Sequence, residues 1–529
     1  MNIPNVLRRQ TVTQAAIIIA VISFISKFFG FFREVLVAKY FGATGQTDAF
    51  LVAMLIPISI LGLFAAGFST LVIPYYLEKK AKGIEAAKKF VNSAFTVWGM
   101  VFILLSILIF IFAPICVRVI AYGFKGERFA LAVTLTRYLI ISGLFTVLSG
   151  MFTGIFQAEK QFFFPIFITF LGNVALVFSL FFLHRYLGLH SWTVGQILNA
   201  SIAFFAMFFM LWWRYKFFHT ISYRQVDWRE IRQFALLLLP LVISGGISML
   251  NQIVDKTIAS SLDAGSIAAL NFAQRVWGIP ISLLSTPIAT AIFPTFSELA
   301  LNGSARQEYE ARLQKTLAVS FYLVIPSTVF IYFLAQPIVR LFFERGAFDV
   351  RATSLTAFVL QMYVFGLFGH AISPILSKVF YSFKNTVTPV IIGIICVALN
   401  VILNIVLSKI MGAAGIALAT SIVMILNFVL YSLFLKKYLN PFPRQLATET
   451  IKIILSSIPV GLICYFSLPY FHGVTASTLH SFASLAIKIA VVGFVSIIPF
   501  FAFSHYFKLE SYAFIKSYAL SILKKIAGK

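Results

Sequence analysis

The chain has 529 residues, of which 60% are hydrophobic and only 11% are charged, and its mean hydropathy is +0.95. A soluble protein carries about 25% charged residues, so this composition excludes a soluble multidomain enzyme. Apolar runs of about 18 residues or more recur from end to end, which is the signature of membrane-spanning helices. The sequence therefore predicts an all-α polytopic membrane protein.

Fourteen apolar segments follow one another along the chain, each near the length of about 20 residues that a membrane-spanning helix needs. No loop between them is long enough for a soluble catalytic domain. The expected spans are 13–40, 47–77, 90–121, 130–157, 162–184, 192–214, 231–260, 265–298, 314–341, 353–382, 386–409, 412–435, 450–470 and 483–506.

The formal net charge of +25 is distributed unevenly between the loops. Basic residues gather in alternate loops, for example 78–89, 214–232 and the tail "ILKKIAGK" at 522–529. This alternation is the positive-inside pattern, so the charge indicates cytoplasmic loops beside anionic membrane lipids. With an even number of spans, both termini are expected in the cytoplasm. No basic segment is long enough to form a nucleic-acid-binding domain.

The first expected span contains ionisable residues at membrane depth, in the stretch "SKFFGFFREVLVAKYFGATGQTDAF". Each such residue costs roughly 2.5–3.5 kcal/mol by insertion scales and calls for a reason. Lys27 and Glu34 are seven residues apart and share a helix face, whereas Arg33 projects about 120° from Lys27. The two cations face one cavity only if the helix bends, for example near Gly30. The alternative is that Arg33 and Glu34 snorkel to an interface.

An internal repeat relates the two halves of the chain. The segment ending at Pro165 matches the one ending at Pro389, 389 − 165 = 224 residues later. Upstream, the segment from Thr134 matches the one from Ser354, 354 − 134 = 220 residues later. The repeat unit holds six helices, so both copies enter the membrane in the same direction. We expect two pseudosymmetric lobes, 1–220 and 221–440, and two further helices with a basic cytoplasmic tail in 441–529, an architecture typical of secondary transporters with a midplane substrate site.

The repeat also relates charged residues of the two halves. Arg33 and Glu34 fall on Asp255 and Lys256 of the second copy. Arg275 lies in an apolar helix five residues before a proline, so we expect it to point inward. Asp255 could instead neutralise Lys256 locally.

A second polar group lies on the eleventh and twelfth expected helices. Asn400 and Asn404 are i, i+4 neighbours, and Thr420 follows on the next helix. Together with Asp255 they offer only oxygen ligands, which suit a hard cation such as Na⁺. Hydrogen bonding between helices is the alternative explanation.

Motifs of enzymes are missing from the sequence. It contains no GxxxxGK[ST] loop, so it carries no ATPase of its own, and it has no HExxH, CxxC or GxSxG. We expect neither a cofactor nor a metal site. A transporter of this kind draws on Na⁺ or H⁺ coupling, membrane potential or downstream consumption of its cargo.

The stretch "GFFREVLVAKYFGATGQTDAFLVAMLIP" closely resembles the opening of the MurJ/MviN lipid II flippases, of the multidrug/oligosaccharidyl-lipid/polysaccharide exporter superfamily. The resemblance continues through "AAGFSTLVIPYYLE", "AQRVWGIP", "ERGAFD" and "VFYSFKNTVTP" and covers nearly all of the chain. It implies a fourteen-helix, two-lobed transporter of the bacterial cytoplasmic membrane that functions as a monomer. Such a transporter moves lipid II, an undecaprenyl-diphosphate-linked peptidoglycan precursor, by alternating access from the inner to the outer leaflet.

The resemblance also implies substrate-binding residues. Lys27 stands where the family usually has an arginine, and Arg33, Asp48 and Arg275 match family positions, with Glu34 and Lys256 as supporting charges. The chain departs from the family at Leu61 and Ala66, where MurJ proteins often carry an arginine and a glutamate. Another polyprenyl-diphosphate-linked oligosaccharide is therefore an alternative cargo. A cation-coupled drug antiporter of the same superfamily is a further alternative, and a membrane-embedded glycosyltransferase would need catalytic carboxylates in a sizeable outer loop.

Overall fold

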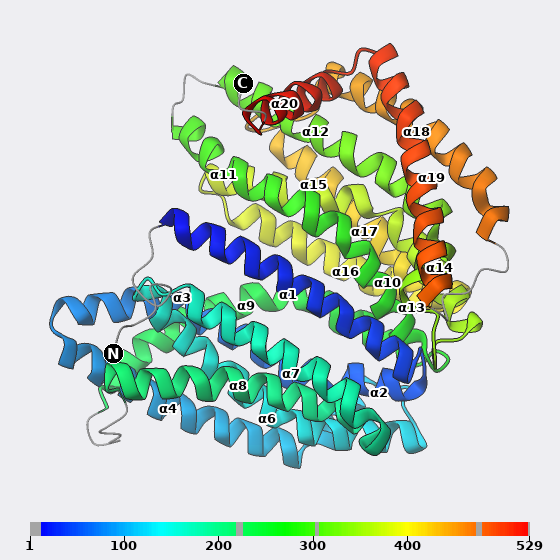
Figure 1. Ribbon diagram of the computed structural model, residues 1–529. Coiled ribbons are helices and arrows are strands. Elements are labelled where there is room, and N and C mark those ends of the chain that lie inside the picture. The colour runs from blue at the N-terminus through cyan, green and yellow to red at the C-terminus, as the bar shows by residue number, and fades with distance from the viewer. Residues whose placement is uncertain (1–11, 218–225, 302–305, 472–478, 527–529) are drawn as a thin grey trace. The chain divides into compact units, whose positions relative to one another are not determined.

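The computed structural model describes residues 12–217, 226–301, 306–471 and 479–526, and every element assigned within these ranges is a helix (Figure 1). Eleven of the described helices are long and apolar enough to cross a membrane, or twelve if one bent pair counts as a single span. The all-α membrane fold is thus confirmed. The two remaining expected spans, 13–40 and 231–260, coincide with helices α1 and α9. The exact count of fourteen stays a prediction.

The chain divides into two compact units, residues 1–267 and 268–529. The first unit is built around α6, which packs against α2, α3, α4, α5 and α8, while α1 lies along α7. Its elements are α1 (Val12–Phe41), α2 (Gly45–Ala53), a π-helical segment (Leu55–Ile60), α3 (Leu61–Ala81), α4 (Ile84–Ile111), α5 (Ala113–Ile120), α6 (Gly126–Ala158), α7 (Phe163–Leu187), α8 (His190–Tyr215) and α9 (Trp228–Ala259).

The second unit is built around α12, α15 and α17. Helix α12 packs on α15 and α18, and α17 packs on α14, α15 and α16. The elements are α10 (Ser266–Pro280), which begins at the boundary, a π-helical segment (Ile281–Ser285), α11 (Thr286–Leu301), α12 (Arg306–Phe333), α13 (Ala335–Phe343), α14 (Val350–Val364), α15 (Leu367–Ser382), α16 (Val387–Met411), α17 (Ala413–Leu435), α18 (Arg444–Ser467), a 3₁₀ segment (Leu468–Phe471), α19 (Leu479–Tyr506) and α20 (Glu510–Ile526).

Glycines allow α3 and α6 to approach backbone to backbone. A Cβ atom added to Gly150 would lie 2.4 Å from the Ala65 carbonyl oxygen, and one added to Gly154 would lie 2.9 Å from that of Ser69. Small residues spaced by four are the usual way in which membrane helices pack closely, since lipid supplies no hydrophobic drive between them. This contact orders α3 against the central helix of the first unit.

The repeat seen in the sequence reappears in the shape of the helices. A π-helical segment follows α2 around Pro57, and another follows α10 directly after Pro280. Proline removes a backbone donor, and one extra residue in the turn accommodates its ring. The copies differ at α6, which is continuous, whereas its counterpart is bent by 45° between α14 and α15. Both copies have the same length, since Gly126–Ala158 and Val350–Ser382 each hold 33 residues and both of their ends are related by a shift of 224, so the bend arises without an insertion.

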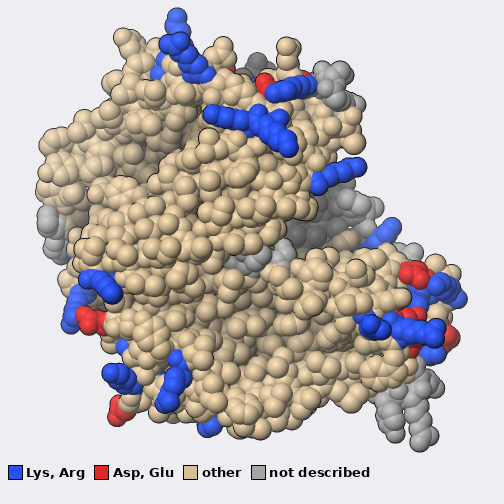
Figure 2. Space-filling view, turned by 180° about the vertical axis from the view of Figure 1, so that it is seen from behind, with Lys and Arg blue, Asp and Glu red and all other residues tan. Residues whose placement is uncertain are grey.

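The face of the molecule drawn in Figure 2 is mostly uncharged. On the face in Figure 2, the charged side chains form separate groups with broad uncharged surface between them. Such a surface is expected where helices face lipid. The structure also adds an element that the sequence did not predict: residues expected as part of a basic tail form helix α20 after the last expected span.

Candidate functional site

The first charged group lies on the second half of α1. Arg33 Nη2 donates a 2.7 Å hydrogen bond to Glu34 Oε1, and the exposed fractions of these side chains are 19% and 2%. The Arg33 Nε atom is also buried, and it has no hydrogen-bond partner among the residues that the structure describes. A buried N–H group without an acceptor lowers the stability of the protein, so such a group is well suited to donate a hydrogen bond to a bound ligand. Arg33 therefore offers a ready contact for an anion.

Lys27 lies six residues before Arg33 on α1 and is exposed. The opposite side of α1 is held by α7, where Phe29 meets Phe170 edge to face with 5.2 Å between ring centroids. Phe28 and Phe32, beside Lys27, are exposed as well. Helix α1 thus presents a cation and aromatic rings away from α7.

The loop between α1 and α2 is fixed by its own sequence, "GATGQTD". Gly42 ends α1 with a positive φ of 62°, a conformation that glycine adopts without strain. Thr44 caps α2 by accepting a hydrogen bond from the Thr47 amide. The buried Thr47 hydroxyl donates to the Gly42 carbonyl at 2.8 Å. These contacts orient the first turn of α2, which carries Asp48.

Asp48 is fully buried within the first unit, with a side chain that is 0% exposed. Its Oδ2 atom accepts hydrogen bonds from Arg128 Nη2 at 3.0 Å and from the Gly265 amide at 2.7 Å. The carboxylate thereby joins α2 to the start of α6 and to the loop after α9. The sequence placed Asp48 among substrate-contacting residues and did not reveal this tie, because Gly265 is far away in the chain.

Asp255 and Lys256 lie near the end of α9, also in the first unit. Asp255 is buried, and Lys256 Nζ donates to the Leu51 carbonyl of α2 at 3.2 Å. Lys256 therefore joins α9 to α2. Its partner Leu51 lies three residues after Asp48 in the sequence.

Arg275 lies on α10 in the second unit and is exposed. Its neighbours hold the helix in place: Gln274 donates to the Tyr363 hydroxyl at 2.9 Å, and Trp277 stacks on the Tyr363 ring at 5.3 Å. Because these neighbours face α14, the guanidinium of Arg275 is carried on an anchored helix. A π-helical segment begins at Ile281, six residues after Arg275, and such segments are frequent at functional sites.

The amide group on α16 is buried. Asn404 Nδ2 donates to Asn400 Oδ1 at 2.9 Å, and the Thr420 hydroxyl donates to the Ile416 carbonyl of its own helix. Both of these hydrogen bonds stay within one helix. Among the described residues, no group of three or more His, Cys, Asp or Glu side chains is placed to hold a metal ion.

The two positions where the sequence departs from the family pattern differ in their surroundings. Leu61 is buried in the aromatic core of the first unit, whereas Ala66 is exposed on α3. The surroundings of Leu61 are apolar, so an arginine at this position would be buried among hydrophobic side chains.

An apolar groove of about 500 Å³ lies within the second unit, between α10, α12, α13, α18 and α19. Its walls include Ile279, Pro326, Phe330, Phe342 and Ile497. Sequence patterns did not indicate it, because its lining residues look like ordinary membrane-facing side chains. A groove with such walls accommodates a hydrocarbon chain.

Comparison with known proteins places these features in a family. A family model described as lipid II flippase MurJ matches residues 37–488. A probable lipid II flippase MurJ of Rickettsia prowazekii is 28% identical over 517 residues, covering 95% of this chain and 99% of the relative.

Solved structures agree with this assignment. A lipid II flippase MurJ in an inward closed conformation superposes with a TM-score of 0.78 at 27% identity, over 93% of this chain and 98% of that one. An inward-facing multidrug resistance MATE transporter of the MOP superfamily, 14% identical, covers 80% of this chain and 98% of its own with a TM-score of 0.63, and shares the fold. The chain therefore belongs to the lipid II flippase MurJ family.

Proposed function

We propose that this chain moves lipid II from the inner to the outer leaflet of the bacterial cytoplasmic membrane. Family membership supports the cargo. The observation that carries the proposal is Arg33, an arginine in a membrane helix that Glu34 orients and whose buried Nε has no partner among the described residues. A diphosphate supplies the acceptors that this donor lacks.

The physical task is to carry an anionic diphosphate sugar past hydrocarbon while its polyprenyl tail stays in lipid. Arginine binds phosphate oxygens through a planar fork of donors, and lysine acts as a point charge. We assign Arg33 and the exposed Lys27 to the diphosphate, and Arg275 of the second unit to the same cargo. Asp48 and Lys256 act as positioning residues, since both join elements of the first unit.

The apolar groove of the second unit suits the polyprenyl tail. Its walls are almost entirely hydrocarbon and aromatic, so a tail segment lying there avoids water at little cost. The groove by itself thus suits the apolar end of a lipid-linked sugar.

The chain acts as a transporter, and we propose that it relocates its cargo without a covalent change. Its loops carry positive charge in alternation, which supports cytoplasmic termini, and one copy holds all of the assigned residues, which supports a monomer as the working unit. Energy comes from outside the chain, through Na⁺ or H⁺ coupling, the membrane potential or downstream consumption of the cargo.

The proposal is tested by transport of lipid II in proteoliposomes that contain the purified protein. Arg33→Ala is expected to lower the rate of flipping at least tenfold, because a charge-assisted hydrogen bond is worth about 1.5–3 kcal/mol. Arg275→Ala is expected to do the same. The control is Lys39→Ala, which removes an exposed cation from the same helix and should leave the rate unchanged.

Normal flipping by both arginine variants would contradict the proposal. The same vesicles, loaded with a different polyprenyl-diphosphate-linked oligosaccharide, test the second candidate cargo, which the apolar Leu61 and Ala66 favour. If the wild type moves that lipid faster than lipid II, the alternative cargo is correct. Chemical analysis of the recovered lipid should show it unaltered, and a new covalent product would instead indicate an enzyme.

A further inference from the structure

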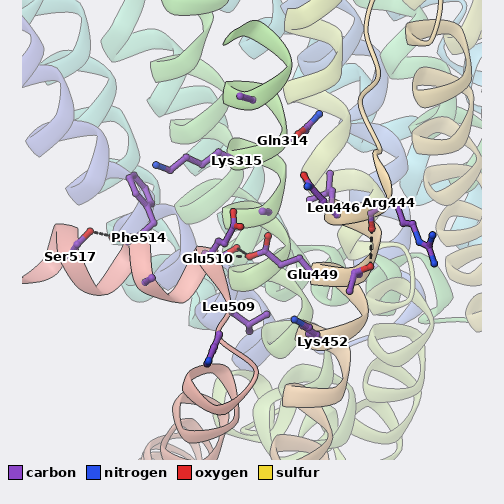
Figure 3. Close-up of a pocket in the computed structure, with 17 residues that line it drawn as sticks. Gln314, Lys315, Arg444, Leu446, Glu449, Lys452, Leu509, Glu510, Phe514 and Ser517 are labelled. Atoms are coloured by element: carbon purple, nitrogen blue, oxygen red, sulfur yellow. Dashed lines mark hydrogen bonds between the residues drawn. The ribbon is translucent and has the colours of Figure 1, made fainter. Parts of the chain in front are cut away.

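A second cavity of the second unit lies outside the groove and the charged residues described above. It has a volume of about 1010 Å³ and is formed by residues 311–318 in the N-terminal half of α12, the first turns of α18, the residues that follow α19, and the start of α20 (Figure 3). Small-molecule sites usually measure roughly 300–1,000 Å³, so this cavity is large enough for a lipid headgroup.

Positive charge predominates in the walls of this cavity. Four cations line it, Lys315, Arg444, Lys452 and Lys508, against two carboxylates, Glu449 and Glu510. The cations come from three separate elements, so folding gathers them in one place. A cavity with this surplus of cations favours an anionic ligand.

Several of these side chains are already fixed by their neighbours. In Figure 3, Lys315 reaches from α12 towards Phe514 of α20, and its Nζ lies 4.0 Å from the centre of that ring. Glu449 accepts hydrogen bonds from the Ser511 amide at 2.9 Å and from the Ser511 hydroxyl at 2.6 Å. Glu449 thus caps the start of α20, and its charge is used within the protein.

Two of the cations keep their donors available. Among the described residues, neither the Arg444 guanidinium nor the Lys508 ammonium has a hydrogen-bond partner, and both side chains are exposed. The Lys452 ammonium donates one long hydrogen bond, of 3.3 Å, to the Phe507 carbonyl. The cavity therefore offers an anion several donors at once.

The position of the cavity along the helices indicates headgroup depth. Helices α12, α18 and α19 are all apolar enough to cross a membrane, and the cavity is formed where the first two begin and the third ends. Exposed apolar side chains lie close in sequence to its lining residues: Ile451 directly precedes Lys452 on α18, Phe503 lies five residues before Lys508, and Phe514 is in the cavity wall itself. A ligand here would meet cations on one side and hydrocarbon-compatible surface on the other.

We propose that this cavity binds the phosphate-bearing headgroup of one anionic phospholipid, whose acyl chains lie along the exposed apolar residues of α18 and α19. Basic pockets between membrane helices on the cytoplasmic side are suited to such headgroups. The bound lipid would bridge α12, α18 and α20, and so hold the terminal helix against the unit.

The test is a titration of the purified full-length protein, in neutral detergent, with phosphatidylglycerol and with phosphatidylcholine, followed by native mass spectrometry. We expect one phosphatidylglycerol to bind more tightly than phosphatidylcholine. The triple variant Lys315→Gln, Arg444→Gln, Lys508→Gln should bind phosphatidylglycerol at least tenfold more weakly.

The matched control is Lys384→Gln, Lys436→Gln, Lys437→Gln, which removes the same charge from exposed residues of the same unit outside the cavity. Equal weakening in both triple variants would overturn the proposal, because it would show diffuse attraction alone. Glu510→Gln, which removes one carboxylate from the cavity, should tighten binding two- to threefold. Because misfolding cannot raise the affinity, this variant tests the role of charge even if the triple variant fails to fold. Equally tight binding of soluble glycerol phosphate would also overturn it, because the ligand would then be a free phosphate anion.

Discussion

At the scale of single residues, the two carboxylates near the start of the chain do different work. Glu34 sits beside Arg33 and leaves part of that guanidinium available, whereas Asp48 is enclosed by Arg128 and the Gly265 amide. A carboxylate with 0% exposure and two donors on one oxygen has little left to offer a ligand. Its chemistry is that of a structural tie between α2, α6 and the loop after α9.

We predict that Asp48→Asn destabilises the protein itself. Removing one partner of a buried ion pair costs about 3–5 kcal/mol, because the other charge is left unpaired, and the lower end applies since Arg128 is partly exposed. The thermal unfolding midpoint of the purified protein in detergent should fall. Glu127→Gln, the same kind of change at an exposed carboxylate next to Arg128, should leave it unchanged. An unaltered midpoint with slower flipping would instead make Asp48 a substrate contact.

At the scale of helices, close packing of α3 on α6 depends on glycine. We predict that Gly150→Ala lowers stability by about 1–3 kcal/mol, as overpacking does, because the new methyl group would meet the Ala65 backbone. Gly99→Ala on α4 is the matched control, since a Cβ there meets nothing within 4 Å. Alanine is also the better helix former, so this control should be neutral or slightly stabilising. Thermal unfolding in detergent measures both, and equal midpoints would show that α3 and α6 separate freely.

Much of the helix pattern could be predicted from the sequence, because lipid forces every spanning segment to be apolar and helical. Each expected span falls on helical residues, for example 13–40 on α1 and 231–260 on α9, although 90–121, 314–341 and 353–382 are each divided between two helices. The bend between α14 and α15 could not be predicted, since an apolar run reads the same whether the helix is straight or broken. Helix α20 was missed because its basic residues resemble those of a tail.

The candidate site was predictable only in part. Charged residues at membrane depth are easy to recognise in an apolar sequence. Arg33, Glu34 and Arg275 could therefore be identified from the free energy that it costs to insert an ionisable side chain into a membrane. Their partners could not, because Asp48 meets Gly265 and Lys256 meets Leu51 across long stretches of chain. Pairings of this kind are set by how the helices pack, and the spacing of residues along the sequence does not encode them.

At the scale of the whole molecule, transport needs an energy source other than ATP bound by this chain, since the sequence has no ATP-binding motif. Buried amides in a membrane helix are costly, and Asn400 and Asn404 present oxygen atoms that suit Na⁺. We predict that Asn404→Leu removes any dependence of lipid II flipping on the sodium gradient, while the protein still inserts. Proteoliposomes with and without a sodium gradient measure this.

The control for that experiment is Asn173→Leu on α7, the repeat counterpart of α16. Asn199 Nδ2 donates to Asn173 Oδ1 at 3.1 Å, so this variant removes a membrane amide that joins α7 to α8. Loss of packing alone should slow flipping equally with and without sodium, whereas loss of an ion ligand should abolish the difference between the two conditions. If Asn404→Leu flips lipid II normally at all sodium concentrations, the amide pair serves packing, and the energy comes from H⁺, the membrane potential or downstream consumption of the cargo.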